Sequence, residues 1–185
     1  MIIEDGAGTG YKVKVNEKNR AKVQASISTQ LHDASIEDEV AYDFSSGDFV
    51  SITTTDTETG VFYLKNTSTT LKLIINSLRT CSDAVHKVKM YKNPTGGTLI
   101  SAAVAGSSTN MNFTSSKVAD AIVYTGDEGR TLTGGTVVTQ HINNVGHSTD
   151  HFENALIIGP GESIALTFSL ASAGDCCVRI TAYYE

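Results

Sequence analysis

The chain has 185 residues, a formal net charge of −6 and 40% hydrophobic residues, and a chain of this size suits one domain with its own core. The excess of carboxylates argues against nucleic acid as the main partner, since phosphate binding requires concentrated lysine and arginine. No apolar run approaches the ~18–20 residues of a membrane helix, so we expect no membrane partner either.

The first 25 residues differ in pattern from the rest of the chain. Glycines punctuate residues 1–10, residues 11–15 alternate between apolar and basic side chains, and residues 21–27 resume extended character after a polar turn. We predict that residues 1–25 form an extended arm outside the core, because the glycines make this segment costly to order alone. The alternation over residues 11–15 also fits an integral sheet strand. The arm residues expected at a capsid or subunit interface are Tyr11, Lys12, Val13, Lys14, Val15, Arg20 and Lys22.

Residues 26–185 are predicted to form a single β domain. Alternating or β-branched runs bounded by turn residues predict its strands. The expected strands are residues 49–55, 61–64, 71–78, 85–91, 98–104, 119–124, 136–142, 155–158, 163–170 and 176–184. Residues 105–116 are expected to be a loop with Met111 and Phe113 as anchors, and residues 143–154 a long polar loop.

The helical candidate is residues 35–42. Ser35 and Asp38 resemble a weakened capping box, and Ile36 and Val40 are four apart. About eight strands with turn signals every 8–12 residues predict an all-β fold, an antiparallel β-sandwich or barrel. Jelly roll is the preferred topology, although spacing alone does not give the strand order.

Candidate metal ligands are confined to one stretch. His141, His147 and His151 fall within eleven residues, and His147 and His151 would share a face in a helix or a strand. Imidazoles can bind zinc, but the stretch is expected to be a loop and has no ligand signature. Surface histidines are therefore the favoured interpretation, with a metal shared between subunits at a symmetry axis as the alternative.

The cysteines offer little chemistry. Cys81, Cys176 and Cys177 show no disulfide spacing pattern, and neighbours on a strand point to opposite faces. We expect reduced thiols in a protein made in the cytoplasm. A nucleophile–base pair of Cys81 and His86 lacks an oxyanion-hole motif and an orienting carboxylate. The sequence therefore predicts a protein that is not an enzyme and needs no cofactor.

Charge is distributed in blocks. Residues 1–22 hold five basic and three acidic side chains, residues 23–64 hold eight acidic and no basic ones, and residues 65–92 hold six basic and one acidic. Such blocks can guide subunit docking through complementary fields. The alternative is a set of solvated faces that alternate in sign.

Several short phrases, spread over nearly the full chain, resemble those of small head-decoration (cement) proteins of tailed bacteriophages. They are Met-Ile-Ile-Glu-Asp-Gly at 1–6, Gly-Tyr-Lys-Val-Lys-Val-Asn at 10–16 with Asn19-Arg20, Phe-Tyr-Leu-Lys-Asn at 62–66, Asn-Pro-Thr-Gly-Gly-Thr at 93–98, Asn-Phe-Thr-Ser-Ser-Lys at 112–117, Leu-Thr-Gly-Gly at 132–135 and Gly-Pro-Gly-Glu-Ser at 159–163.

The resemblance implies a β-sandwich subunit, usually a homotrimer, on the surface of the virion capsid. It also implies that an arm and a base join subunits of the major capsid protein, and that the protein is made in the cytoplasm of a bacterial host. Many weak contacts would gain strength from multivalency on a repeating lattice. Two alternatives remain: a receptor- or glycan-binding β domain of a phage tail or fibre, disfavoured by the absence of Trp, and a small β-sandwich hydrolase or lyase.

Overall fold

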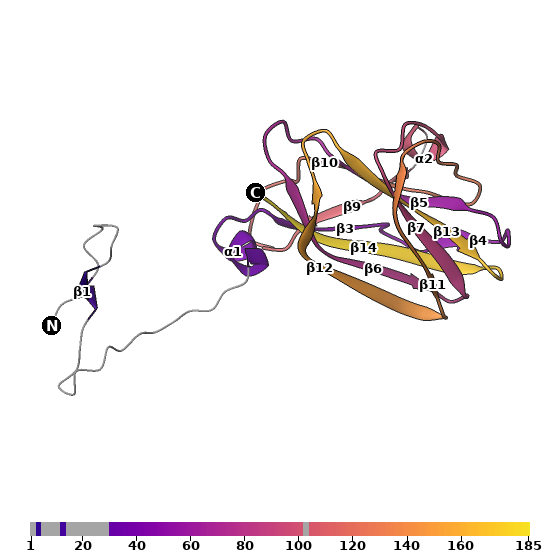
Figure 1. The fold of residues 1–185 in the computed structure, drawn as a ribbon, viewed down its shortest axis with the longest axis horizontal. Helices are drawn as coiled ribbons and strands as arrows, with labels where there is room; N and C mark the ends of the chain where they lie inside the picture. The colour runs from indigo at the N-terminus through magenta and orange to yellow at the C-terminus, as the bar shows by residue number, and fades with distance from the viewer. Residues whose placement is uncertain (1–2, 5–11, 14–29, 102–103) are drawn as a thin grey trace.

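The computed structural model describes residues 3–4, 12–13, 30–101 and 104–185, which fold mainly into two antiparallel sheets (Figure 1). The first sheet has the order β12 (Gly146–Ile158), β6 (Leu73–Ser82), β14 (Gly174–Tyr184), β3 (Ala41–Ser45) and β9 (Ser107–Asn110), and β4 (Val50–Ile52) also pairs with β14. The second has the order β11 (Thr136–Asn143), β7 (His86–Lys92), β13 (Ser163–Leu170), β5 (Thr59–Asn66), β10 (Ala121–Thr125) and β8 (Val104–Ala105). We call them the β14 sheet and the β13 sheet.

The strand order is that of a jelly roll. Strands β12-β6-β14-β3 of one sheet face strands β11-β7-β13-β5 of the other, which is the arrangement of two Greek keys in an eight-stranded sandwich. The predicted all-β antiparallel sandwich is therefore confirmed. Strands β8, β9 and β10 extend the sheets beyond β3 and β5, so β11 and β12 end the two sheets on the other side.

Alternating side chains from both sheets form the core between them. In β13, Ile164, Leu166 and Phe168 point into this core, and the strand spans the residues that the alternation predicts. The largest fully buried side chains are Phe44, Phe62, Phe168, Ile52, Leu64, Leu73, Ile75, Leu78, Met90, Leu99, Ile158 and Leu166.

Two short helices cover the outer faces of the sheets. Helix α1 (Gln30–Ile36) packs Ala34 against a cluster that contains Ile74 and Tyr183 of the β14 sheet. Helix α2 (Thr98–Ser101) packs Leu99 in a cluster with Tyr63 and Ala165 of the β13 sheet. The C-terminus lies beside α1, where the Tyr183 hydroxyl donates a hydrogen bond to Gln30 at 3.0 Å (Figure 1).

Four sequence predictions of local structure are wrong. The helix expected over residues 35–42 does not form, because α1 ends at Ile36, Glu39 has a φ of 57°, a left-handed conformation that a helix cannot continue, and β3 begins at Ala41. Residues 98–101 form α2 rather than a strand. Residues 107–110, expected within a loop, form β9. Residues 146–154, expected within a loop, belong to β12. Their polarity suits an edge strand, where backbone pairing with β6 rather than burial defines the element.

The N-terminal segment is described only in part. Strand β1 (Ile3–Glu4) pairs antiparallel with β2 (Lys12–Val13) in a sheet of their own. The other predicted arm residues, Tyr11, Lys14, Val15, Arg20 and Lys22, lie outside the described residues. The division into an arm and a domain thus stays a prediction. In the described ranges, no helix is long and apolar enough to cross a bilayer.

Candidate interaction surfaces

Strands β11 and β12 leave one side of the sandwich open. Each ends its sheet, and no other described strand pairs with its outer edge. Natural edge strands are usually protected by charged side chains or proline. The β11 sequence, Thr-Val-Val-Thr-Gln-His-Ile-Asn, has neither an acidic residue, a lysine or arginine, nor a proline. This edge is therefore chemically suited to contact with another protein chain.

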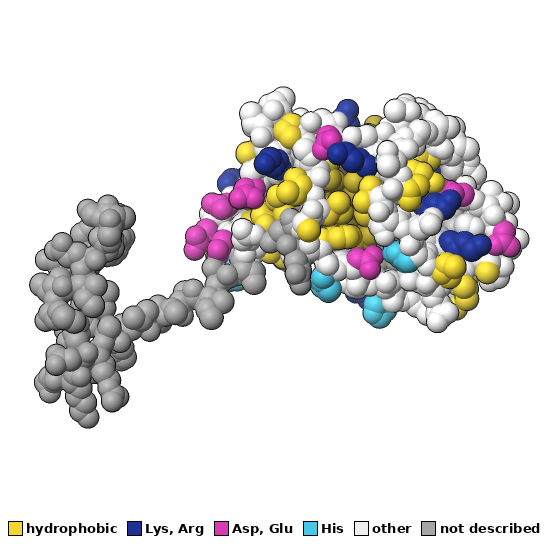
Figure 2. Space-filling model, viewed as in Figure 1, with side chains coloured by type: hydrophobic (Ala, Val, Ile, Leu, Met, Phe, Trp, Pro, Cys, Tyr) yellow, Lys and Arg dark blue, Asp and Glu magenta, His cyan; other side chains and the backbone are white. Residues whose placement is uncertain are grey.

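Exposed apolar side chains follow the same two strands. Ile142 is 69% exposed and Val145 63% exposed, and Val137, Val138 and Ile157 are also exposed. We call these five residues the β11–β12 surface. Figure 2 shows hydrophobic side chains gathered in the region where Figure 1 places β11 and β12. Exposed apolar side chains along an open edge are candidates for contact with a partner.

Two shallow cavities adjoin this surface. One, of about 230 Å³, lies between the strands and is lined by Val138, Leu156 and Ile164 among others. The other, of about 330 Å³, is lined by Val88, His141 and Ile142. Apolar side chains of a partner would find space in both.

The three histidines lie on strands. His141 belongs to β11, within the strand predicted over residues 136–142. His147 and His151 belong to β12, where they pair with Cys81 and Ser77, so the predicted loop is wrong for these two. His147 and His151 therefore share the outer face of the β14 sheet, as predicted, and both are exposed. No group of three or more His, Cys, Asp or Glu residues in the described part of the chain is placed to hold a metal ion.

The prediction of reduced cysteines is wrong for two of the three. Cys81 on β6 and Cys177 on β14 form a disulfide, with their Cα atoms 5.1 Å apart. The two residues are direct partners in the strand register, although 96 positions separate them in sequence. No spacing motif could indicate this pairing, because the jelly-roll topology alone brings the strands together.

Cys176 is buried on the opposite face of β14, as the alternation predicts. Burial, aided by the nearby carboxylates of Asp175 and Asp83, raises the pKa of this thiol to about 12. The thiolate is the reactive form, so Cys176 is an inert core residue. The imidazole of His86 is also buried and stacks on Phe168 with ring centroids 5.5 Å apart.

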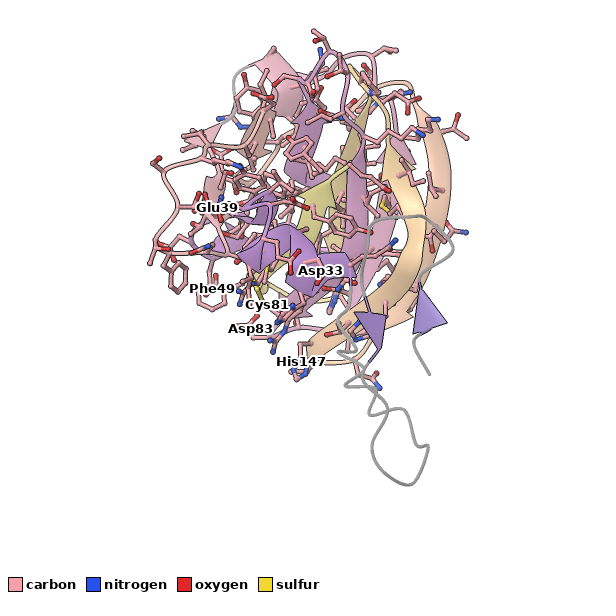
Figure 3. The ribbon with its side chains drawn as sticks, turned by 90° about the vertical axis from the view of Figure 1, so that its left-hand side faces the viewer. Asp33, Glu39, Phe49, Cys81, Asp83 and His147 are labelled. Atoms are coloured by element: carbon pink, nitrogen blue, oxygen red, sulfur yellow. A yellow bond between two sulfur atoms is a disulfide. The ribbon has the colours of Figure 1, made fainter. Side chains whose placement is uncertain are left out.

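A cleft of about 470 Å³ lies beside the disulfide. Figure 3 shows Phe49, Cys81, Asp83 and His147 near one another around it. Arg79 also lines the cleft and stands directly opposite Arg179 in the strand register. Arg179 is neutralised by Asp43 at 2.7 Å, whereas Arg79 forms no ion pair with a described residue. The cleft thus combines a guanidinium that has no carboxylate partner among the described residues with an exposed aromatic ring.

The charge blocks meet within one domain. Lys87 lies 3.8 Å from Asp56, Lys89 lies 2.6 Å from Glu58, and Lys92 lies 2.9 Å from Glu162. The first two pairs join the acidic block of residues 23–64 to the basic block of residues 65–92. Each of these lysines therefore has a carboxylate partner within the same chain. For this part of the surface, that favours solvated faces over charge blocks that guide subunit docking.

Glu58 is the centre of one such group on the outer face of the β13 sheet. Its carboxylate accepts hydrogen bonds from Lys89 at 2.6 Å, Tyr91 at 2.6 Å and Thr167 at 2.8 Å. Burial raises the pKa of Glu58, but the three hydrogen bonds outweigh it and hold the pKa below its usual value. Glu58, the residue before β5, is thereby hydrogen-bonded to side chains of β7 and β13.

Comparison of the sequence with models of known protein families found no match, and comparison with curated proteins found none either. The proposed function therefore rests on the surfaces described above and on the resemblance of the sequence phrases.

Proposed function

We propose that this protein is a virion structural protein that decorates and stabilises a bacteriophage capsid by binding across subunits of the major capsid protein. The β11–β12 surface is the observation that carries the proposal. It places exposed apolar side chains on two edge strands and the turn between them, and one of these strands, β11, has no Asp, Glu, Lys or Arg, a combination that an isolated soluble domain normally avoids. A protein that works by assembly would cover it.

The β11–β12 surface is the proposed contact between copies in a homotrimer. Three copies related by a threefold axis would each bury a β11 edge and the adjoining cavities. A charge-free strand permits close approach of identical surfaces, because no like charges meet there.

The arm is the proposed contact with the shell. Residues 1–22 have two more basic than acidic side chains, counted as five against three, in a chain that is acidic as a whole. A basic segment can bind an acidic neighbouring surface, and three arms per trimer would multiply a weak contact on a repeating lattice. No turnover is required of such a protein, and the proposal includes no cofactor.

Mixing the purified protein with expanded, undecorated capsids tests the proposal. Co-sedimentation and an electron-microscopy reconstruction should show the protein on the shell, joined to more than one capsid subunit. Failure to bind at micromolar concentration in physiological salt would refute the capsid proposal.

The second candidate is a receptor- or glycan-binding domain of a phage tail. The cleft beside the disulfide favours it, since Phe49 could stack on a sugar ring and Arg79 could bind an anionic group. Binding to host cells or to a glycan array, abolished by Phe49→Ser, would support this candidate in place of the first.

A further inference from the structure

The most exposed large apolar side chains lie far from the β11–β12 surface, in the connection between β9 and β10. Phe113 is 88% exposed and Val118 is 85% exposed. We call residues 111–118 the Phe113 loop. The sequence predicts Phe113 as a loop anchor, but its ring points away from the domain into solvent.

Hydrogen bonds fix the base of this loop to the residues that follow α1. The Asn110 side chain donates to the carbonyl of Glu39 at 2.8 Å, and the amide of Met111 donates to the carbonyl of Ala41 at 2.9 Å. The hydroxyl of Ser115 donates to the carboxylate of Glu39 at 2.8 Å. The loop is thus attached to the domain by both backbone and side chains.

A second set of hydrogen bonds fixes the tip. The Asn112 carboxamide oxygen accepts from the amide of Thr114 at 3.1 Å and from its hydroxyl at 2.7 Å. The Asn112 carbonyl accepts from the amide of Ser115 at 2.9 Å. Phe113 stands between these groups, so its backbone is ordered before any partner binds. A preorganised aromatic side chain loses little conformational entropy on binding, which is typical of an interface anchor.

Acidic residues border the loop. Glu37, Asp38 and Glu39 precede β3, and the ammonium of Lys117 donates to the carbonyl of Asp38, which brings the two segments together. Figure 2 shows acidic side chains gathered at the α1 end of the domain, and Figure 3, viewed toward that end, labels Asp33 and Glu39 there. An acidic rim on one side of an exposed apolar side chain complements an apolar pocket that has basic side chains at its border.

We infer that the Phe113 loop anchors the protein to an apolar pocket bordered by lysine or arginine side chains on the surface of a different protein. The inference rests on the proposed function, under which that surface belongs to the capsid shell. A second copy of this chain fits less well, because its net charge is −6 and would repel the acidic rim.

The strand order gives a second reason to expect that the Phe113 loop does not mediate contacts between copies of this chain. Strands β9 and β10, which flank the loop, extend the sheets on the side opposite to β11 and β12. A trimer that uses the β11–β12 surface therefore leaves the Phe113 loop free. The loop also lies near the residues that follow α1, and the N-terminal segment joins the domain at α1, so the arm and this anchor can reach the same surface.

The test compares Phe113→Ser with Val85→Ser in binding to expanded, undecorated capsids. Val85 is the control, because it is an exposed apolar residue in the turn between β6 and β7 and belongs to none of the proposed surfaces. Phe113→Ser should weaken binding by about 10- to 100-fold, the range of an interface anchor, and Val85→Ser by less than about twofold. Val118→Ser, the second variant, should weaken it by about 3- to 10-fold.

A charge variant tests the rim. Glu37→Gln with Asp38→Asn should weaken binding at low salt and reduce its salt dependence, since fewer charge contacts remain to be screened.

Three outcomes overturn the inference. If the wild-type protein binds capsids and both Phe113→Ser and Val118→Ser bind equally well, the inference fails and the proposed function stands. If Phe113→Ser changes the mass measured by light scattering instead of capsid affinity, the partner is a second copy. If the wild-type protein does not bind capsids, the proposed function and the inference fail together.

Discussion

Loss of the Cys81–Cys177 disulfide should lower stability substantially without changing the fold. The bond joins two neighbouring strands that stay paired along the ladder on both sides of it, so the native structure does not depend on the covalent link. The freedom of the unfolded chain does depend on the link, because the disulfide closes a loop between residues that are 96 positions apart in sequence. In the chain-entropy model a loop of this length corresponds to about 4.7 kcal/mol at 25 °C. For a chain of this size, that corresponds to a fall in Tm of roughly 9–19 °C.

The measurement is thermal unfolding by circular dichroism with and without a reducing agent, after mass spectrometry of the non-reduced protein has verified the bond. The double variant Cys81→Ser with Cys177→Ser should melt where the reduced wild type melts and should not respond to the reductant. Cys176→Ala is the matched control, since it removes the buried free thiol and should keep the full response. A fall of less than about 3 °C with the bond verified would refute the reasoning, because the unfolded chain would then gain little freedom.

Four further predictions follow from other parts of the molecule. Ile142→Asp should shift the mass in light scattering from trimer to monomer with little change in Tm, because it places a charge on the proposed contact between copies. If the wild-type protein is a monomer at micromolar concentration in both low and physiological salt, the prediction that the free protein is a trimer is wrong. Deletion of residues 2–22 should leave the circular dichroism spectrum nearly unchanged and sharply weaken capsid binding, and a truncated chain that fails to fold would show that the segment is an integral strand. Chelator treatment should leave Tm in place, whereas a fall of more than roughly 5 °C would reveal a structural metal. Hydrogen bonds hold the pKa of Glu58 in the folded state below its ordinary value, so its stabilising contribution is present above the unfolded pKa and is lost as the pH falls through the folded pKa. Glu58→Gln should therefore lower Tm at pH 7 and reduce the loss of Tm on acidification, and an unchanged loss of Tm on acidification would contradict this role.

Strands are predictable from this sequence where burial of one face makes apolar and polar residues alternate. Residues 163–170 alternate because one face meets the core, and β13 has those bounds. The prediction failed at β12, where polar side chains on an edge strand carry no such signal. The fold class was predictable because many strands share one pattern, whereas the strand order depends on long-range pairings that spacing does not encode.

The candidate sites were less predictable than the fold. The register that joins Cys81 to Cys177 is a property of the finished topology. The sequence predicts Phe113 as a loop anchor, but the structure exposes its ring, because the direction of the side chain depends on the hydrogen bonds of Asn110 and Asn112. The β11–β12 surface had a signal that sequence reasoning did not use, namely that a predicted strand lacked charge. That signal becomes informative only when the strand is known to lie at an edge.

The position of the C-terminus beside α1 has a practical consequence for engineering (Figure 1). A purification tag fused after Glu185 would lie at the end of the domain that carries α1, which is the end proposed to face the shell. The turn between β3 and β4 offers a better place, since Gly47 has a φ of 81° with open space around it and Asp48 and Phe49 are exposed. Foreign peptides inserted there would project from the far end of the sandwich, so under the proposed function a decorated particle would display them outward in many copies.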